Sequence, residues 1–184
     1  MIFETIKVKD KTGREIELRS ADERDAEILL KWLKTVNTES PYLTCEPEEI
    51  KMTLEQEREF IKGITEAPKD LLLLAFEDGN HIGNCRMSSI GSTIRYRHRC
   101  SVGIALYQAY SGCGIGRLML ETVLAVAKDT GYEQAELEVA VPNEKAIALY
   151  KSLGFEIFGT VPHGVKYKDG SYADYYSMVK TLVD

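Results

Sequence analysis

The chain has 184 residues and a formal net charge of −6, from 23 Lys and Arg against 29 Asp and Glu. This length corresponds to one domain, 1–184, and 44% hydrophobic residues suffice for a self-supporting core. The acidic balance argues against a nucleic-acid-binding surface, and the longest apolar run, residues 71–76, is too short to span a membrane. We expect a cytoplasmic protein without a nucleic-acid or membrane partner.

The cysteines and histidines form no metal-binding pattern. The four cysteines are widely spaced, without a Cys-x-x-Cys pair, and the three histidines are scattered. We expect free thiols in a reducing compartment and no bound metal.

The chain begins with a pattern typical of a β-hairpin. Residues 2–8 and 15–19 flank a turn at residues 10–13. Ser20 followed by Glu23 matches a capping box, and apolar residues at helical spacing come next. The pattern predicts a helix that begins just after Ser20.

A second helix and a second hairpin follow. Thr53 and Gln56 repeat the capping-box pattern before another set of helically spaced apolar residues. An apolar strand over 71–76, a turn at 77–80 and a strand over 82–90 predict the hairpin.

The middle of the chain predicts a strand, a buried helix and another strand. The first strand runs from about 95 to 106. A long helix over 115–126 follows, and its apolar face is so wide that we expect the helix to be buried on most sides. Gly131 ends this helix, and residues 135–141 alternate with strand period.

The last part of the chain predicts a short helix and two strands. Asn143 caps the helix and Gly154 stops it. Strands over 155–161 and 173–183 then surround a turn at 169–170. The whole pattern indicates a mixed α/β fold, with a mixed sheet and helices on both faces.

A glycine-rich stretch carries the clearest chemical signal. Residues 111–117 read Ser-Gly-Cys-Gly-Ile-Gly-Arg, between a strand and the long helix. Glycines let backbone amides converge on an anion, and a helix start adds about half a positive charge. A P-loop needs Gly-Lys followed by Ser or Thr, and a dinucleotide fingerprint needs glycine where Arg117 stands. The stretch predicts a phosphate-binding turn; the alternative is that its glycines only permit a tight turn.

A second motif follows on the short helix. Residues 143–155 read Asn-Glu-Lys-Ala-Ile-Ala-Leu-Tyr-Lys-Ser-Leu-Gly-Phe. With the glycine-rich stretch, it resembles the GNAT superfamily of acyl-CoA-dependent N-acetyltransferases, most of all the small bacterial members that acetylate amines or protein N-termini. The resemblance runs from about Val102 to Thr160. Ser111 stands where the family usually has Gln or Arg, and Arg117 could supply that positive charge.

The resemblance implies a fold and a co-substrate. The fold is a mostly antiparallel, twisted sheet of about seven strands, splayed between two parallel strands, with helices on both faces. The co-substrate is acetyl-CoA, whose pantetheine arm and thioester carbonyl would bind free backbone groups of the splayed strand. The implied cofactor-binding residues are Ile104, Ala105, Leu106, Ser111, Gly112, Cys113, Gly114, Ile115, Gly116, Arg117, Asn143, Ala146 and Tyr150.

The resemblance also implies two catalytic residues, Tyr150 and Glu138. Tyr150 would donate a hydrogen bond to the departing sulfur, because a tyrosine with a pKa of about 10 is a weaker acid than a thiol with a pKa of about 8.5. Its alternative role is that of a core tyrosine. Glu138 matches a glutamate implicated as the base in ribosomal-protein N-terminal acetyltransferases. Its alternative role is in the solvated face of an alternating strand, and a water relay is another route for the proton.

Other candidates have no motif behind them. His98, His163 and Asp174 are further candidate bases. A nucleophilic Cys113 is disfavoured, because it would lie at the phosphates rather than beside the acyl group.

The acceptor site is expected outside the matched segment. Residues 37–52 and the tyrosine-rich segment 163–176 are the regions that could line it. Arg95, Arg97 and Arg99 alternate, so we expect them to share one strand face, either exposed or attracting an acidic acceptor.

The sequence predicts direct transfer of an acetyl group from acetyl-CoA to a primary amine of a small molecule or a peptide N-terminus. Two alternatives remain open: a catalytically silent CoA-binding sensor or partner-binding module, and a dinucleotide-dependent oxidoreductase. A homodimer is the oligomer that the resemblance suggests.

Overall fold

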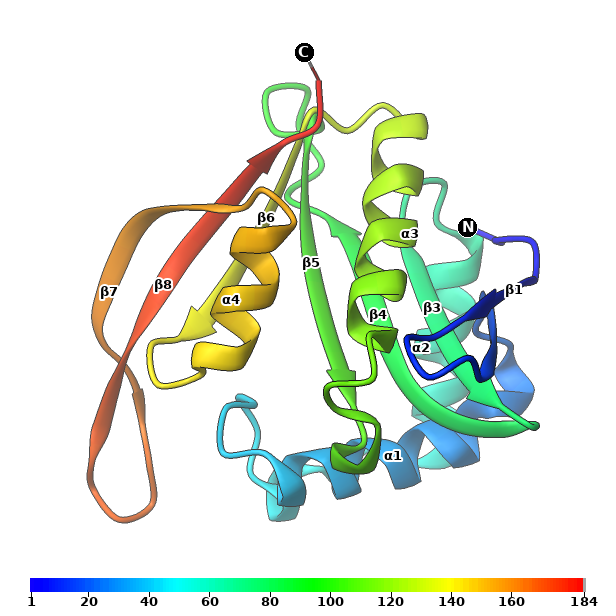
Figure 1. Ribbon diagram of the computed structural model, residues 1–184, viewed down its shortest axis with the longest axis horizontal. Helices are drawn as coiled ribbons and strands as arrows, with labels where there is room; N and C mark the ends of the chain where they lie inside the picture. The colour runs from blue at the N-terminus through cyan, green and yellow to red at the C-terminus, as the bar shows by residue number, and fades with distance from the viewer. Residues whose placement is uncertain (184) are drawn as a thin grey trace.

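The computed structural model describes residues 1–183, which form a twisted eight-stranded sheet covered by helices on both faces (Figure 1). The strands are β1 (Ile6–Lys9), β2 (Glu15–Ser20), β3 (Leu71–Glu77), β4 (Asn80–Ser89), β5 (Arg99–Leu106), β6 (Gln134–Ala140), β7 (Glu156–Lys166) and β8 (Tyr172–Thr181). The helices are α1 (Ala26–Glu39), α2 (Leu54–Glu66), α3 (Ile115–Asp129) and α4 (Glu144–Ser152). Single 3₁₀ turns occur at Glu23–Asp25, Pro47–Glu49 and Gln108–Tyr110.

The sheet is antiparallel except at one place. Its strand order is β1-β2-β3-β4-β5-β6-β8-β7, and only β5 and β6 are parallel. A parallel pair needs a long crossover, which α3 provides. The β5–β6 pairing covers only Arg99–Ser101 against Gln134–Glu136. Beyond it the strands diverge, β6 continuing beside β8, and Figure 1 shows the opening widen toward the start of α3. The predicted splayed sheet is confirmed.

Two hydrophobic layers sandwich the sheet. The larger lies under α3 and α4 and contains the fully buried Ile115 and Met119, whereas the smaller lies under α1 and α2 and contains Leu29 and Ile61. The residues 71–76 of β3 point alternately into the two layers. This explains why their sequence is apolar without alternation, as in other strands buried on both faces.

We expect Leu73→Ala to lower the free energy of unfolding by about 2–5 kcal/mol, because it removes a fully buried side chain of β3 and leaves a cavity. Denaturant-induced unfolding measures this change. Ile94→Ala is the control: that side chain is 75% exposed, and its loss should change the free energy of unfolding by less than about 0.5 kcal/mol. Equal, small effects of the two substitutions would contradict this placement of β3.

The predicted start of the first helix is wrong by a few residues. Ser20 ends β2, pairs with Leu73, and accepts a hydrogen bond from the Phe3 amide. The capping box is formed instead by Asp22 and Asp25, and the Asp25 carboxylate accepts from the Asp22 amide at 2.8 Å. Because Ser20 is paired within the sheet, Asp22 serves as the N-cap and begins the helical turn instead. The capping box that begins α2 is confirmed.

The predicted strand from residue 95 is also too long. β5 begins at Arg99, and the amides of Tyr96 and Arg97 both donate to the Thr93 carbonyl in a turn. Arg95, Arg97 and Arg99 therefore do not share a strand face.

No helix in residues 1–183 has the length and apolarity to cross a bilayer.

Candidate active site

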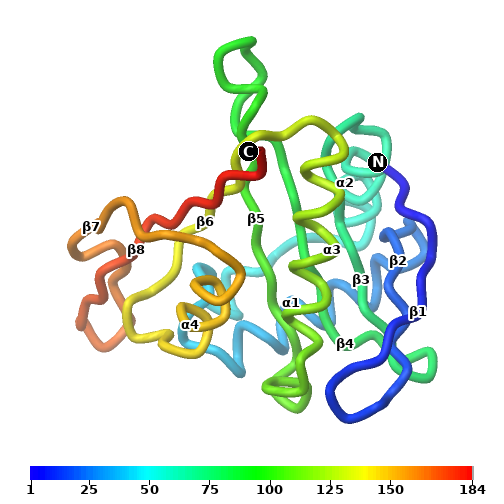
Figure 2. Tube along the Cα trace, turned by 45° about the horizontal axis from the view of Figure 1, so that its top comes forward, coloured from blue at the N-terminus to red at the C-terminus, as the bar shows by residue number. Residues whose placement is uncertain are grey.

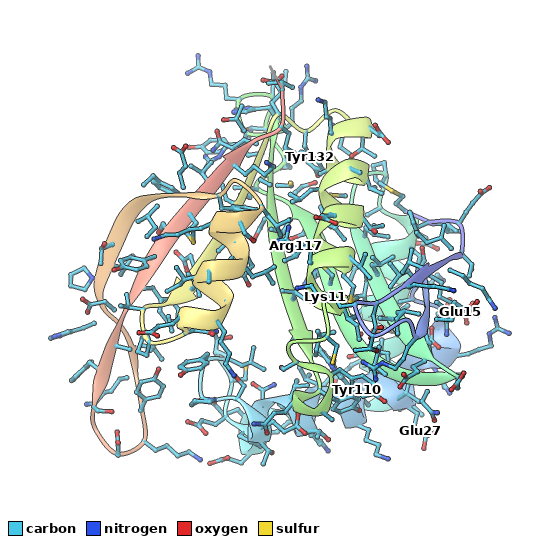
Figure 3. The ribbon with its side chains drawn as sticks, viewed as in Figure 1. Lys11, Glu15, Glu27, Tyr110, Arg117 and Tyr132 are labelled. Carbon is cyan, nitrogen blue, oxygen red and sulfur yellow. The ribbon has the colours of Figure 1, made fainter. Side chains whose placement is uncertain are left out.

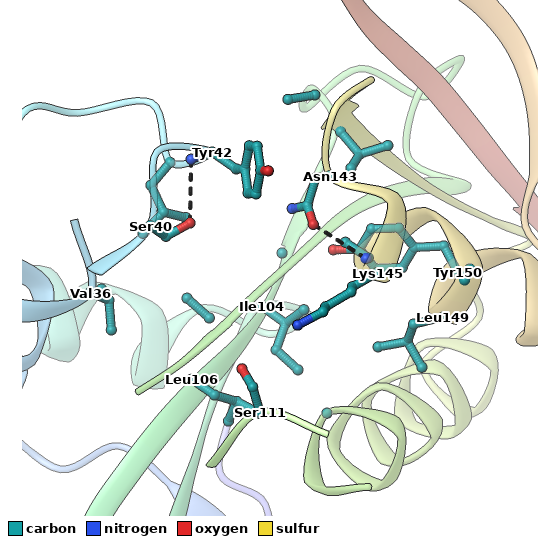
Figure 4. Close-up of a pocket in the computed structure, with 18 of the residues that line it drawn as sticks. Val36, Ser40, Tyr42, Ile104, Leu106, Ser111, Asn143, Lys145, Leu149 and Tyr150 are labelled. Atoms are coloured by element: carbon teal, nitrogen blue, oxygen red, sulfur yellow. Dashed lines mark hydrogen bonds between the residues drawn. The ribbon is translucent and has the colours of Figure 1, made fainter. Parts of the chain in front are cut away.

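A cavity of about 970 Å³ lies where β5 and β6 separate. It is bounded by β5, β6, the glycine-rich turn, α4 and the loop after α1 (Figure 4). Figure 2 shows α4 beside the opening between the two strands. The two sequence motifs, more than twenty residues apart, therefore meet at one cavity.

The glycine-rich turn has the geometry of an anion site. Gly112 and Gly114 have φ angles of 82° and 88°, in the region that favours glycine. Gly114 is the N-cap of α3, and no side chain among residues 1–183 caps that helix start. The first-turn amides of α3 are thus left to bind another acceptor, and the helix dipole favours an anion there.

The space around the turn is closely fitted. A Cβ on Gly114 would come within 2.7 Å of Lys11 Cγ. A Cβ on Gly116 would lie 3.5 Å from Leu149 and 3.7 Å from Ile104, so α3 begins in close contact with both α4 and β5. A side chain at residue 114 would therefore collide with Lys11, whereas a Cβ at residue 116 would make ordinary van der Waals contacts.

The predicted members of this turn play different parts. Ser111, Gly112, Gly114, Gly116 and Arg117 line the cavity. The Ile115 side chain is fully buried in the core. Cys113 lies behind the turn, where its carbonyl accepts a hydrogen bond from the Lys11 amide at 3.1 Å. The side chains of Ile115 and Cys113 therefore support the turn, and only their backbone could serve a ligand.

The backbone of β5 presents unpaired groups to the opening. At its two ends, Arg99 accepts from the Ile90 amide and Tyr107 donates to the Ile82 carbonyl, both at 3.1 Å and both toward β4. Because backbone groups alternate in direction along a strand, odd-numbered residues bond β4 and even-numbered residues face β6. Ala105 thus directs its backbone to β4. The pairing of Ser101 with Glu136 uses the Val102 amide, so within residues 1–183 the β5 groups left facing the opening are the Val102 carbonyl and the backbone N–H and C=O of Ile104 and Leu106.

The start of α4 is built as predicted. Asn143 Oδ1 accepts from the Ala146 amide at 3.3 Å, which caps the helix. Both residues line the cavity, and in Figure 4 the Asn143 side chain reaches into it.

The position of Tyr150 fits both roles considered from the sequence, that of a core tyrosine and that of a group at the active site. Its side chain is 8% exposed and packs edge-on against Phe155, with ring centroids 5.9 Å apart, yet it also lines the cavity. Burial raises the pKa of Tyr150 to about 12, and the nearby Cys85 thiol adds to this. Tyr150 therefore keeps its proton at neutral pH, and its hydroxyl can donate a hydrogen bond into the cavity.

The structure separates the two glutamates of β6. Arg99 holds Glu136 through two hydrogen bonds, one of 2.7 Å from Nη2 to Oε2, and this lowers the pKa of Glu136. Glu138 is exposed and lines the cavity. It faces away from α3 and α4, because its neighbours Leu137 and Val139 pack beneath them.

The other candidate bases do not line this cavity. The His98 carbonyl accepts from the amides of Glu133 and Gln134, at the closed end of the β5–β6 pair. The His163 amide donates to Asp174 Oδ1 at 2.8 Å in the β7–β8 hairpin. The geometry thus brings Glu138 alone of these groups to the opening.

Two lysines at the cavity were not singled out from the sequence. Lys11 comes from the β1–β2 turn and lies beside the start of α3 (Figure 3). Lys145, in the first turn of α4, extends its side chain toward Ile104 (Figure 4). Arg117 also lines the cavity, and it donates to Glu121 Oε1 at 3.2 Å and to Ser152. Three cations thus line the cavity in a protein of net charge −6.

The expected acceptor regions contribute unequally. From residues 37–52, the segment 39–44 lines the main cavity, whereas from residues 163–176 only Tyr175 does so. The other tyrosines of the closing segment do not reach it.

An opened sheet beside a glycine-rich helix start is the framework of an acyl-CoA-binding enzyme. The family model for the acetyltransferase (GNAT) family matches residues 29–155, and the chain belongs to this family.

Individual relatives agree with this assignment. The chain is 30% identical over 111 residues to the L-amino acid N-acetyltransferase AaaT of Escherichia coli, covering 59% of this chain and 66% of that protein. It is 32% identical over 112 residues to the N-alpha-acetyltransferase RimI of Mycobacterium tuberculosis, covering 61% and 66%. The chain thus spans 66% of the length of each of these curated relatives. A GNAT-family acetyltransferase structure from Streptococcus pneumoniae superimposes with a TM-score of 0.86 and 28% identity, covering 90% of this chain and 99% of that one.

Proposed function

We propose that this protein transfers the acetyl group of acetyl-CoA to a primary amine of a small molecule or a peptide N-terminus. The observation that carries the proposal is that one cavity joins the start of α3, which no side chain in residues 1–183 caps, to the β5 backbone groups that face the opening. Membership of the acetyltransferase family supports it, as do relatives named for acetylation of amino acids and of α-amino groups. Because acetyl-CoA is the donor, we place the reaction in the cytoplasm.

Different parts of the cavity bind different parts of acetyl-CoA. The amides of residues 112–117, with Lys11 nearby, bind the diphosphate. Asn143 and the even-numbered residues of β5 hold the pantetheine arm and direct a backbone N–H at the thioester oxygen. Donors fixed on developing negative charge typically contribute about 10²- to 10³-fold to a rate.

The transfer needs no covalent enzyme intermediate. The neutral amine attacks the carbonyl carbon, so that a C–N bond forms, the C–S bond breaks and the thiolate leaves. Tyr150 donates a hydrogen bond to that sulfur. The acceptor is mostly an ammonium ion at neutral pH, and we assign removal of its first proton, before attack, to Glu138 through water, since a carboxylate is a weak base toward an alkylammonium. The nitrogen loses its second proton to solvent as the tetrahedral intermediate collapses to the amide. A proton from solvent completes the thiol.

The test is release of free thiol from acetyl-CoA across a panel of amines, polyamines, amino acids and peptides. Turnover with at least one class of acceptor supports the proposal. Tight CoA binding without turnover on any acceptor would favour a CoA-binding sensor, and a rise in melting temperature with a nicotinamide cofactor but not with CoA would favour an oxidoreductase.

We expect Lys11→Met to weaken acetyl-CoA binding by about 3- to 10-fold, because it removes one positive charge near the phosphates and keeps the aliphatic stem beside Gly114. Calorimetric titration measures the dissociation constant. Lys9→Met, an exposed lysine of β1, is the matched control and should leave it unchanged. If both variants bind like the parent protein, Lys11 does not contact the phosphates.

A further inference from the structure

A second cavity lies on the sheet face covered by α1 and α2. Its volume is about 440 Å³, within the range of roughly 300–1,000 Å³ that is typical of small-molecule sites. Apolar side chains form most of its wall: Leu29, Trp32, Leu33, Leu43, Met52, Phe60 and Leu72. It therefore has the size and polarity to hold an aliphatic or aromatic group.

The two cavities meet at β5. Residues 102–105 line both of them, and so does Leu43. The same stretch of β5 includes Ile104, whose backbone N–H and C=O face the opening between the strands. An amine placed at that opening can therefore extend the rest of its structure into the second cavity.

Glu57 interrupts the apolar wall in an unusual way. The buried residues of α2 are Glu57, Ile61 and Ile64, at the spacing of one helix face. Glu57 is only 5% exposed and lines the second cavity. Its neighbour Glu55 pairs with Arg58 at 3.5 Å, whereas no hydrogen bond or ion pair within residues 1–183 engages the Glu57 carboxylate.

Burial of the Glu57 carboxyl carries an energetic cost that a bound cation would offset. Burial raises the pKa of Glu57, which reflects the cost of removing its charge from water. An apolar residue would fill this helix position without that cost. Charged residues at positions where the helix pattern calls for an apolar side chain are found most often at functional sites.

The surroundings of Glu57 indicate the chemistry of a ligand that would suit this cavity. An ionised carboxylate only accepts hydrogen bonds, and it binds cationic donors most strongly. One cation of the protein, the exposed Arg86, also lines this cavity, with its guanidinium 5.0 Å from the Phe60 ring centroid and without an ion pair to Glu57 within residues 1–183. The apolar walls suit an aliphatic stem that carries such a cation inward.

Resting on the proposed acetyltransferase function, we propose that the second cavity binds the acceptor and that Glu57 selects a primary amine whose aliphatic stem ends in a second cationic group. One nitrogen lies at the β5 opening and is acetylated, while the other pairs with Glu57. Glu57 is then a specificity-determining residue that does not touch the reacting atoms.

Matched pairs of acceptors test this assignment. The pairs are 1,5-diaminopentane with pentylamine, and lysine amide with norleucine amide, each assayed for thiol release at saturating acetyl-CoA. We expect kcat/KM to favour the dicationic member of each pair by about tenfold or more. Glu57→Gln keeps the shape of the side chain and should remove the preference through a higher KM for the dicationic members alone. Glu59→Gln, exposed on the same helix, should keep the preference.

Binding of the same four amines to the CoA-loaded protein, measured by calorimetry, separates this proposal from the proposed function. A binding preference that Glu57→Gln abolishes, without thiol release, would support the role of Glu57 and contradict acetyl transfer to these amines. Equal use and binding of both members, equal losses for both in Glu57→Gln, or no binding of the dicationic members would overturn the role of Glu57.

Discussion

Gly114→Asp should weaken acetyl-CoA binding by at least about 100-fold, because it places a negative charge where the diphosphate is expected to bind. The substitution acts in two further ways. The φ angle of 88° disfavours any side chain, and a Cβ would come within 2.7 Å of Lys11 Cγ. Calorimetric titration of the purified variant with acetyl-CoA measures the loss.

Gly170→Asp is the matched control for this substitution. Gly170 lies in the β7–β8 turn with a φ angle of 85°, and nothing lies within 4 Å of a Cβ built there. It thus takes the same added charge and a similar backbone strain, far from the cavity. We expect it to bind acetyl-CoA as the parent protein does. If Gly114→Asp still binds acetyl-CoA with near-parent affinity while folded, the assignment of the turn as a diphosphate site is wrong.

Local patterns predicted most elements of the fold, and long-range pairing explains the errors. Thr53 and Gln56 predicted the start of α2, since a capping box involves only the residues of one turn. Ser20 carried an equally good pattern, but its pairing with Leu73 of a distant strand decided that it would end β2. The position of Arg95 likewise depends on a turn that periodicity does not reveal.

The candidate site shows the same division. The turn at 111–117 and the helix from Asn143 are continuous segments, so their patterns could be read directly. Lys11 lies about a hundred residues earlier and reaches Gly114 only through the folded sheet. Glu136 and Glu138 stand at equivalent alternating positions of β6, so the sequence does not separate them. Only the structure shows that Arg99 engages Glu136 and leaves Glu138 at the cavity. Helical spacing alone puts Glu57 on the apolar face of α2, four and seven residues before Ile61 and Ile64, but only the structure shows that this face is covered.

Tyr150→Phe should lower kcat by about 10- to 100-fold while the dissociation constant of acetyl-CoA changes less than about twofold. The Phe155 contact needs only the ring, and the Tyr150 hydroxyl has no hydrogen-bond partner within residues 1–183, so the free energy of unfolding should change little. Turnover should fall because the departing thiolate loses a donor. With a pKa of about 12, Tyr150 is too weak an acid to protonate a thiolate fully, so we expect a reduced rate rather than a complete loss.

Tyr132→Phe gives the comparison that isolates this effect. Tyr132 is fully buried near the far end of α3, away from Arg117 (Figure 3), and its hydroxyl is hydrogen-bonded to Ser89. Its loss should lower the free energy of unfolding by about 0.5–1.5 kcal/mol and leave kcat unchanged. Single-turnover thiol release with saturating acetyl-CoA reports the acetyl-transfer step in both variants. Because the two substitutions remove the same atom from buried rings, unchanged single-turnover rates in both would mean that Tyr150 serves the core alone, and that the leaving sulfur is stabilised by another group.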